Sequence, residues 1–559
     1  MGEKDFPQIG FKDQLILKHL LEHAARMRPE GEIVYKNIFR GNYAELYERC
    51  MRLSNALSNL GIKKGSKVIC FEWNTHRFLE VFFAVPCMGA IMHMGNPLLT
   101  PEQMVYLINL AEDDVLIFNK DFLSTMEFIF PKLKTVKHFV LLQDDKSDIK
   151  TKITPLYRYE DLLESAASEY TYPDLEEDTV ASLSCTTGTT GDPKICFFNH
   201  RQHIMHTLIW SNMLQGFSGK RGLDPRRDLT IQVVPMFHAH GWGIPYIATF
   251  LGCKQVYPGR FITKDFLELL KKEKRPDQGG YMACVATLLN MIVSYPGVEQ
   301  YKECLNGLIY EGGGMRLNTI LAKKALELGM DICSGWGMTE VYTKVGLQYL
   351  KPNMFDWPEE KKIEFLSGTG MAPPFVDQKV VYRNGNEVPK DGKTIGEIVL
   401  RAPWVTQGYY KNEEQSRELW RDGWLHTNDL GTMDQENSVS IIDRSKDVIK
   451  SGGEWISSLK LEDIINTYPK VQEVAVFGAQ SEKWGERPVA LIVPGDAYKV
   501  SINEEELKKH LMKYVDDGKI LKWWIPEKFI FVNDIFRTSV GKLDKKAMRN
   551  NFRKVLEES

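Results

Sequence analysis

A membrane-spanning segment is the first feature that the sequence lacks. Its most apolar stretch, residues 81–92, contains Pro86 and is roughly a dozen residues long, whereas a spanning helix needs about 20. The opening residues, Met1-Gly2-Glu3-Lys4-Asp5, contain no apolar signal core, and Phe6 stands where N-myristoylation requires serine or threonine. We therefore expect a cytoplasmic protein without a transmembrane segment.

The sequence also lacks an excess of charge of either sign. Its net charge is -3, and lysine runs such as Lys271-Lys272 and Lys545-Lys546 lie among acidic residues. A nucleic-acid-binding protein would carry a basic footprint, so no nucleic-acid partner is expected.

Paired cysteines are lacking as well. The nine cysteines are scattered and never spaced as Cys-x-x-Cys. This pattern predicts buried, reduced thiols in a cytosolic protein and argues against a zinc site.

The sequence does have strand-like apolar runs that alternate with amphipathic helical ones, which is typical of layered α/β folds. At 559 residues it exceeds a single core, so at least two domains are expected. The boundary is predicted near Asp443, where a glycine-punctuated β-rich region (368–431) ends. The smaller part that follows has strand patterns at 474–477, 488–493 and 529–532 and helical patterns near Leu461 and Leu507. The predicted fold is α/β, with a large N-terminal domain of layered sheets and helices that includes a β-rich subdomain, and a small α+β C-terminal domain.

Two helix starts are predicted from capping patterns. Thr100, followed by Pro101 and Gln103, combines a threonine cap, a proline in the first turn and a capping box. Ser501, with Glu504 three residues later, predicts a second start of the same type.

Hydroxyls and glycines crowd one segment, Ser184-Cys185-Thr186-Thr187-Gly188-Thr189-Thr190-Gly191-Asp192-Pro193-Lys194. Glycines let a backbone approach a ligand closely, and N–H groups, hydroxyls and a lysine suit phosphate oxygens. A Walker-type loop would open a helix with Gly-Lys-Ser/Thr, but here the apolar, β-prone residues 195–198 follow. The segment is thus predicted to join two strands, either as a polyphosphate cradle or as a solvated loop.

Five further segments have the composition of a nucleotide site, although each alone has an ordinary structural explanation. Trp336, in residues 334–340, is either a purine-stacking ring beside oxygens that suit Mg²⁺ or a core tryptophan in a tight turn. Asp429, in residues 423–431, is a loop carboxylate for ribose hydroxyls or a turn residue. The histidines and aromatics of 235–242 suit a pocket wall better than a metal pair. The charges of 443–453 and the lysine of 537–543 are also typical of solvated surfaces.

In this order, the six segments resemble the adenylate-forming superfamily of acyl-CoA synthetases, aryl-CoA ligases, firefly-type luciferases and peptide-synthetase adenylation domains. The resemblance runs from about residue 42 to residue 549. Three patches resemble the medium- and long-chain fatty acyl-CoA synthetases: residues 451–458, residues 82–90 with Asn96-Pro97, and Pro235-Met236-Phe237-His238 with Trp242 four residues later.

The resemblance implies an AMP-forming acyl-CoA synthetase that uses ATP, Mg²⁺ and coenzyme A. It would convert a carboxylic acid to an acyl-adenylate and then transfer the acyl group to coenzyme A. The implied acid is a medium- or long-chain fatty acid, and an aromatic, alicyclic or branched acid is the alternative. A luciferase-like oxygenase and a carrier-protein-charging enzyme are more remote alternatives, and a homodimer is compatible with the resemblance.

The resemblance also implies roles for single residues. The implied catalytic positions are Lys542, Glu340, Thr339 and His238, and Glu340 also holds Mg²⁺. The implied ATP- and AMP-binding positions are Thr186, Thr187, Gly188, Thr189, Thr190, Gly191, Lys194, Gly313, Gly335, Trp336, Gly337, Asp429 and Arg444. The implied acyl pocket contains His238, Trp242 as its gate, Gly312, Gly314 and Met338.

By the same resemblance, residues 1–443 bind ATP and the acid, and residues 444–447 form a hinge that includes Lys446. Residues 448–559 are then a mobile domain, which brings Lys542 for adenylation and Lys450 and Gly453 for the coenzyme A step. The sequence departs from the family pattern at Ile195-Cys196, at Asn428, at Ala286, and at Glu311 and Met315. The last three lie in the region that shapes the acid pocket, so they make an unusual acid plausible.

Overall fold

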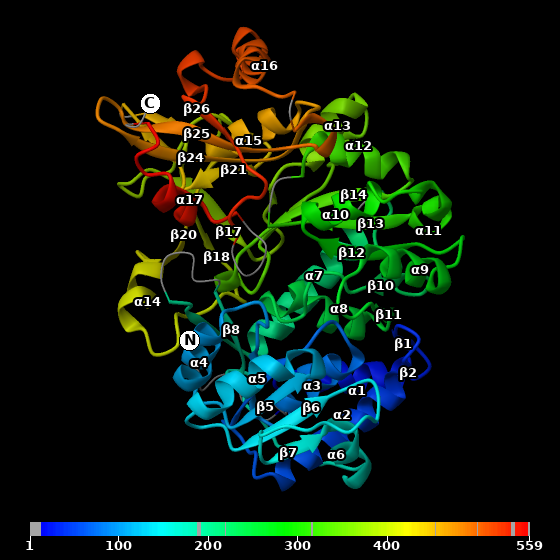
Figure 1. The fold of residues 1–559 in the computed structure, drawn as a ribbon. Helices are drawn as coiled ribbons and strands as arrows, with labels where there is room; N and C mark the ends of the chain where they lie inside the picture. The colour runs from blue at the N-terminus through cyan, green and yellow to red at the C-terminus, as the bar shows by residue number, and fades with distance from the viewer. Residues whose placement is uncertain are drawn as a thin grey trace, which may run out of the picture.

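The structure is a computed structural model that describes residues 10, 13–186, 192–217, 220–314, 317–452, 454–499, 501–537 and 543–556. The strands of these residues form three sheets (Figure 1). The sheet of the early residues lies at one end of the molecule, that of the C-terminal residues at the other, and the largest sheet between them. The predicted α/β fold, with a large N-terminal and a small C-terminal domain, is confirmed.

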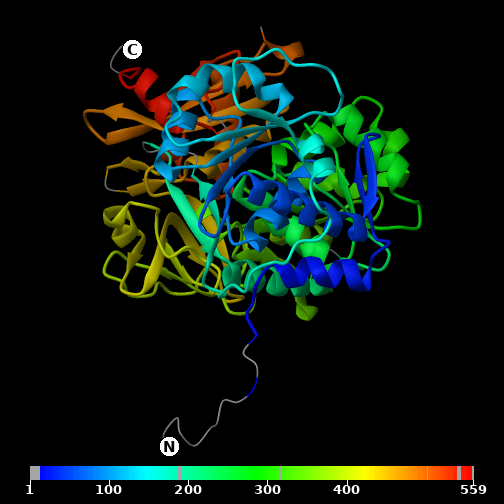
Figure 2. The same cartoon turned by 90° about the horizontal axis from the view of Figure 1, so that it is seen from below.

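The largest sheet has 14 strands in the order β17-β18-β20-β21-β16-β15-β14-β13-β12-β10-β11-β1-β2, with β19 beside β20. Its strands are β1 Glu32–Tyr35, β2 Phe39–Asn42, β10 Leu229–Ile231, β11 Lys254–Tyr257, β12 Gly280–Cys284, β13 Leu308–Gly312, β14 Asp331–Trp336, β15 Gly346–Gln348, β16 Gly370–Met371, β17 Asp377–Val381, β18 Gly396–Arg401, β19 Trp420–Arg421, β20 Trp424–Met433 and β21 Ser438–Arg444. Pairing is parallel from β1 through β11, β10, β12 and β13 to β14, and antiparallel from β14 to β17. Figure 2 sets this antiparallel part, in yellow, to one side of the green α/β part.

The seven-stranded sheet has the order β7-β6-β5-β3-β4-β8-β9, and only β9 runs antiparallel to its neighbour. Its strands are β3 Lys67–Phe71, β4 Ile91–Met94, β5 Val115–Asn119, β6 His138–Leu142, β7 Leu156–Arg158, β8 Val180–Cys185 and β9 Ile195–Asn199. The threonine/glycine segment therefore joins two strands, β8 and β9, as predicted.

The five-stranded sheet has the order β23-β22-β25-β24, with β26 parallel to β25. Its strands are β22 Ile449–Ser451, β23 Glu454–Ile456, β24 Val471–Ser481, β25 Gly485–Pro494 and β26 Lys528–Phe531. The three strands predicted for this part of the chain are confirmed as β24, β25 and β26. The chain passes from the largest sheet to this one between Arg444 and Ile449.

The helices are α1 Lys18–Met27, α2 Tyr43–Asn59, α3 His76–Cys87, α4 Pro101–Ala111, α5 Leu123–Ile129, α6 Tyr159–Ser165, α7 His200–Phe217, α8 Ile244–Leu251, α9 Thr263–Glu273, α10 Ala286–Val293, α11 Lys302–Leu305, α12 Thr319–Glu327, α13 Glu359–Leu366, α14 Glu413–Leu419, α15 Ser458–Asn466, α16 Glu504–Asp516 and α17 Lys545–Asn551. The apolar stretch 81–92 divides between α3 and β4. Every residue of α3 is buried, because it contacts β1 of the largest sheet and β3 and β4 of the seven-stranded sheet. In the described part of the chain, no helix is long and apolar enough to cross a membrane.

One of the two predicted helix starts is confirmed, and the other is wrong. The Thr100 side chain accepts a hydrogen bond from the Gln103 amide, and the Gln103 side chain completes the capping box. Helix α16 instead begins at Glu504 with Asn503 as its cap, which accepts a hydrogen bond from the Glu506 amide. Asparagine caps a helix at least as well as serine, and three glutamates then fill the first turn beside the positive end of the helix dipole.

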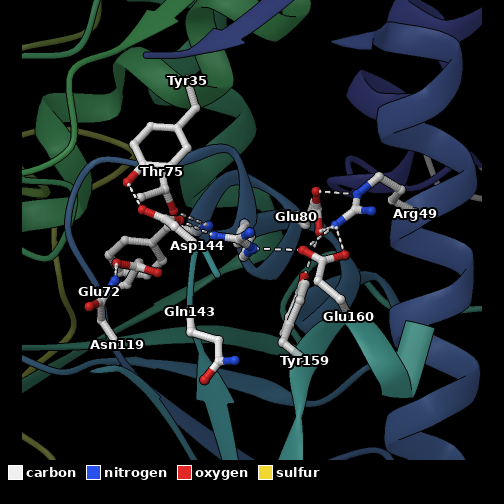
Figure 3. A network of polar contacts seen from close by, with 12 residues as sticks. Tyr35, Arg49, Glu72, Thr75, Glu80, Asn119, Gln143, Asp144, Tyr159 and Glu160 are labelled. Atoms are coloured by element: carbon white, nitrogen blue, oxygen red, sulfur yellow. Dashed lines mark hydrogen bonds and ion pairs between the residues drawn. The ribbon is translucent and has the colours of Figure 1, made fainter. Parts of the chain in front are cut away.

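A polar network lies where strands β3, β5 and β6 of the seven-stranded sheet end (Figure 3). Arg77 of α3 donates hydrogen bonds to Asp144 at 2.8 Å and to Glu160 at 2.7 Å. Glu160 also accepts a hydrogen bond from Arg49 of α2, and the Tyr35 hydroxyl donates to Asp144 at 2.9 Å. These contacts join β1 of the largest sheet to the seven-stranded sheet.

Glu72, directly after β3, is a fully buried carboxyl group in this network. Its Oε1 accepts hydrogen bonds from the Asn119 side chain and the Trp73 amide, both at 2.7 Å. Its buried Oε2 has no hydrogen-bond partner among the described residues. Burial raises the pKa of Glu72 to about 8, against the opposing effect of Arg77 and with a small contribution from Asp144.

We expect the free energy of unfolding to fall with rising pH because of Glu72. Its pKa is raised from 4.5 to about 8 in the folded protein. Between these two pH values the folded protein therefore keeps a proton on Glu72 that the unfolded chain has released. The stabilisation is complete below the unfolded pKa and is lost as the pH rises through the folded pKa. At about 1.4 kcal/mol per pKa unit, the total is on the order of 5 kcal/mol. Chemical denaturation near pH 5 and pH 8 measures it.

Glu72→Gln is the matching variant, because glutamine keeps the shape and removes the titration. It should flatten the pH dependence of stability, whereas Glu414→Gln, at an exposed position, should leave it unchanged. Equal pH dependence in wild type and Glu72→Gln would contradict the assignment.

Candidate active site

One cavity of about 360 Å³ lies where β13 and β14, the ends of the β8–β9 turn and the junction after β21 meet. Ligands commonly bind at the carboxyl ends of parallel strands, and β13 and β14 end here. The cavity brings together fourteen of the predicted site residues: Thr186, Lys194, His238, Trp242, Gly313, Gly314, Gly335, Trp336, Gly337, Met338, Thr339, Glu340, Arg444 and Lys446.

The remaining predicted residues do not line the cavity or are not described. Gly312 is buried at the end of β13, Asp429 lies behind the cavity wall, and Lys450 is exposed on β22, where its amide donates to Glu486. Seven predicted residues lie outside the described part of the chain: Thr187, Gly188, Thr189, Thr190, Gly191, Gly453 and Lys542.

The two ends of the threonine/glycine segment are held together by hydrogen bonds. The Thr186 amide donates to the Lys194 carbonyl at 2.8 Å, and the Lys194 amide donates to the Thr186 hydroxyl at 3.1 Å. The Lys194 ammonium lies 4.4 Å from the centre of the Tyr409 ring. A positive charge therefore lies at the rim of the cavity, where it can attract a phosphate.

Glu340 provides a carboxylate on the same side of the cavity. It lies in a short turn after β14, and its Oε1 accepts a hydrogen bond from the Tyr409 hydroxyl at 2.7 Å. Burial, followed by the Glu340 charge, raises the pKa of Tyr409. Tyr409 therefore stays a neutral donor to one oxygen of Glu340, which lines the cavity.

Trp336 and Asp429 contact each other across the antiparallel part of the largest sheet. Trp336 ends β14, is 6% exposed, and donates a hydrogen bond from Nε1 to Asp429 Oδ2 at 3.2 Å. Arg444 Nε lies 3.4 Å from the other oxygen of Asp429. The Trp336 ring packs in the core and also lines the cavity, and its stacking on a purine stays a prediction.

The prediction that Asp429 lies in a loop is wrong. Asp429 lies within β20, opposite Arg444 in β21, and is 6% exposed. The strand carries a positive φ at Asn428 and a register shift between Leu430 and Gly431, so it bends beside the cavity.

Gly337 has a steric reason to be glycine. A Cβ there would lie 1.5 Å from the carbonyl oxygen of Thr343, because the turn that carries Thr339 and Glu340 folds back against it. Any side chain at this position would displace the turn and with it the Glu340 carboxylate.

His238 and Trp242 come from a turn with unusual backbone conformations. His240, Gly241 and Trp242 all have left-handed dihedral angles, which cost energy for the two residues that are not glycine. The Trp242 ring lies against Gly313, where a Cβ would be 2.5 Å from the ring. The turn thus presses an aromatic wall against the end of β13.

The junction between the large N-terminal part and the small C-terminal part of the chain also borders the cavity. Arg444, Ser445 and Lys446 line it, and burial lowers the pKa of Lys446. The next residue, Asp447, forms a 3.0 Å ion pair with Arg549 in α17.

Sequence reasoning missed two features of the cavity. One is Tyr409, whose hydroxyl positions Glu340, and which no motif distinguishes from the other tyrosines. The other is a buried ion pair between Glu311 and Lys344. The sequence places Glu311 in the region that shapes the acid pocket, as a departure from the family pattern, but does not indicate its partner.

The sequence profile of the family described as AMP-binding enzyme matches residues 21–410. The profile of the AMP-binding enzyme C-terminal domain matches residues 460–542. The chain belongs to the AMP-binding enzyme family. The first match includes the cavity residues from Thr186 to Tyr409, whereas those from Leu419 to Lys446 lie between the two matches.

Relatives of this AMP-binding enzyme match it along nearly their whole length. It is 36% identical to a long-chain-fatty-acid–CoA ligase of Thermus thermophilus, with 98% of this chain and 97% of the relative covered. It is 34% identical to a 3-methylmercaptopropionyl-CoA ligase of Ruegeria lacuscaerulensis (97% and 98%) and 32% identical to a medium-chain-fatty-acid–CoA ligase of Ectopseudomonas oleovorans (98% of each). These findings confirm the predicted enzyme class, an AMP-forming acid–CoA ligase.

The fold of the AMP-binding enzyme is also that of solved structures. A crystal structure of an anthranilate CoA ligase in complex with anthranoyl-AMP has a TM-score of 0.82 at 20% identity, and 100% of each chain is covered. At this identity, the likeness concerns the fold alone.

Proposed function

We propose that this AMP-binding enzyme activates a medium- or long-chain fatty acid and transfers it to coenzyme A. The observation that carries the proposal is that one cavity holds both a nucleotide side, with Lys194, Glu340 and Trp336, and an aromatic wall, Trp242. The fatty-acid ligases among the relatives support the choice of acid.

The first half-reaction joins the acid to AMP. A carboxylate oxygen attacks the α-phosphorus of ATP, the bond to the β-phosphate oxygen breaks, and pyrophosphate leaves with its electron pair. Because two anions must meet, positive groups have to offset their repulsion and stabilise the charge on phosphorus. We assign this task to Lys194 and Lys542, and the holding of pyrophosphate oxygens to Thr186, Thr187, Gly188, Thr189, Thr190 and Gly191.

The nucleotide and the acid each need residues that position them. We assign the purine to the face of Trp336 beside Gly335, Gly337 and Gly313, and the ribose to Asp429 and Arg444. The nucleotide would displace the direct contact of Asp429 with Trp336. We assign the reacting carboxylate to His238, and the tail of the acid to Gly312, Gly314, Met338 and Trp242 as the gate.

The oxygens of Thr339 and Glu340 fit Mg²⁺. Hydroxyl and carboxylate oxygens are hard donors, and Mg²⁺ is usually held by one or two carboxylates together with substrate phosphates and water. The described residues contain no group of three or more His, Cys, Asp or Glu that could hold a metal ion. When bound, Mg²⁺ would neutralise phosphate charge, and Thr339 and Glu340 would hold it.

The second half-reaction forms the thioester. The thiol of coenzyme A loses its proton and attacks the acyl carbonyl, and the bond to the AMP oxygen breaks. We propose that residues 448–559 turn about Lys446 between the two steps, relative to residues 1–443. This turn withdraws Lys542 and brings Lys450 and Gly453 to the path of the thiol.

The test is a coupled assay with ATP, Mg²⁺, coenzyme A and acids from butyrate to palmitate, together with benzoate and cyclohexane carboxylate. We expect acyl-CoA and AMP in equal amounts, with a fatty acid as the best acid. Formation of AMP without thioester, or no product with any acid, would refute the proposed activity. A clear preference for benzoate or cyclohexane carboxylate would instead favour the second candidate function, a ligase of the same mechanism for an aromatic or alicyclic acid. The atypical residues Ala286 and Glu311 in the acid region support this second candidate.

A further inference from the structure

A buried ion pair forms part of the cavity wall beside Trp242. Glu311 is the penultimate residue of β13, two residues before Gly313, and Lys344 follows the turn that carries Glu340. Both line the cavity, together with Val285 and Trp242. Glu311 is 0% and Lys344 3% exposed, so two charges lie inside the protein at the acid side of the site.

The hydrogen bonds of this pair are almost all made within the protein. The Lys344 ammonium lies 2.9 Å from both carboxylate oxygens of Glu311 and 4.4 Å from the centre of the Trp210 ring. The Tyr281 hydroxyl donates to Glu311 Oε2 at 2.5 Å. The side chain of Glu311 is further confined by Gly335, where a Cβ would lie 2.9 Å from its Oε1.

Such a pair is a rigid boundary for an alkyl chain. Separating the two side chains would leave an unpaired charge in a buried place, which costs far more than burying a few methylene groups returns. An acyl tail can therefore lie against the pair but cannot push it aside. Trp210 and Tyr281 close the space behind it, because both are fully buried in the same apolar cluster as Trp242.

The size of the cavity agrees with such a boundary. Its volume of about 360 Å³ is near the lower end of the roughly 300–1,000 Å³ found for ligand pockets. In the proposed function the same cavity receives both a nucleotide and the reacting end of an acid. Little of it remains for a long tail.

We infer that Glu311 and Lys344, held by Tyr281, set the upper limit of acyl chain length. Fatty acids of medium length, whose tail ends at the pair, are accepted, and longer straight-chain acids are discriminated against. This inference rests on the proposed function and narrows its substrate class.

The test replaces the pair as a unit. In Glu311→Leu/Lys344→Met two apolar side chains fill the space without leaving a lone charge, a change that proteins often tolerate. Glu311→Gln/Lys344→Leu is the second variant, because glutamine keeps an acceptor for the Tyr281 hydroxyl. For each, kcat/KM is measured with hexanoate, octanoate, dodecanoate and palmitate, after thermal melting has shown that the variant folds.

We expect wild type to use palmitate about tenfold less efficiently than octanoate, or worse. The double variants should raise the palmitate-to-octanoate ratio by about tenfold, with an unchanged KM for ATP, since the discrimination lies in the tail pocket. The matched control is the remote buried pair His93–Asp113, whose atoms lie 2.8 Å apart. His93→Leu/Asp113→Leu should leave the ratio unchanged.

An unchanged ratio in folded double variants would overturn the inference and leave the proposed function intact. Binding without turnover provides an independent measurement, with non-hydrolysable octanoyl and hexadecanoyl sulfamoyl-adenosine as probes. Wild type should bind the octanoyl probe more tightly and the double variants should lose this preference; equal affinities in wild type would overturn the inference. Absence of thioester with every fatty acid would refute the proposed function, while the probes would still decide on the length limit.

Discussion

Replacing Glu340 by glutamine should lower the rate of acyl-adenylate formation by about a hundredfold to a thousandfold. This is the usual cost of removing a group that stabilises charge at the reacting centre. Glutamine keeps the size of the side chain and its bond from Tyr409, but it loses the negative charge that we assign to holding Mg²⁺ beside the leaving pyrophosphate. Rapid-quench measurement of acyl-adenylate, with enzyme in excess, isolates this step.

Thioester formation from preformed acyl-adenylate should change much less in Glu340→Gln, because pyrophosphate has already left. Tyr409→Phe removes only the hydrogen bond to Glu340 and should cost about tenfold, the value of one hydrogen bond to a charged group. Glu436→Gln, in an ion pair with Lys351 away from the cavity, should not affect adenylation. A Glu340→Gln variant that adenylates at the wild-type rate would remove Glu340 from the catalytic assignment.

Local patterns in the sequence predicted local structure well. The capping box at Thr100 and the β-prone residues 195–198 after the threonine/glycine segment concern neighbours in the chain, and the structure agrees with both. The error at Ser501 arose from two overlapping patterns. Asparagine and serine cap helices about equally well, so choosing between Asn503 and Ser501 requires knowing where the helix packs.

Contacts between distant residues could not be predicted in the same way. The pairing of Asp429 with Arg444 depends on the register of β20 and β21, and the bulge between them shifts that register. Glu311 and Lys344 lie on separate elements, so no spacing in the sequence indicates that they form an ion pair. The family resemblance assigned Asp429 and Arg444 to the site. It could not predict the Glu311–Lys344 pair, because Glu311 departs from the family pattern.

Replacing Lys542 by alanine should abolish most of the first half-reaction and spare the second. Lys542 lies outside the described residues, so its assignment rests on the sequence resemblance. One positive group opposite a developing charge contributes about a hundredfold to a thousandfold in rate. In the proposed cycle Lys542 has left the site before coenzyme A reacts, so its loss should not slow the thiol.

The two half-reactions of Lys542→Ala can be measured separately, as adenylate formation from acid and ATP, and as thioester formation from preformed acyl-adenylate. Lys546→Ala is the matched control, because Lys546 is an exposed lysine nearby and both steps should keep their rates. Lys545 is unsuitable, since its 2.7 Å ion pair with Glu462 joins α17 to α15. Equal loss of both half-reactions in Lys542→Ala would mean that the lysine stays in the site throughout, and the turning of residues 448–559 would have to be abandoned. A selective loss of adenylation would instead place Lys542 in the first step alone, as the proposed turn of residues 448–559 requires.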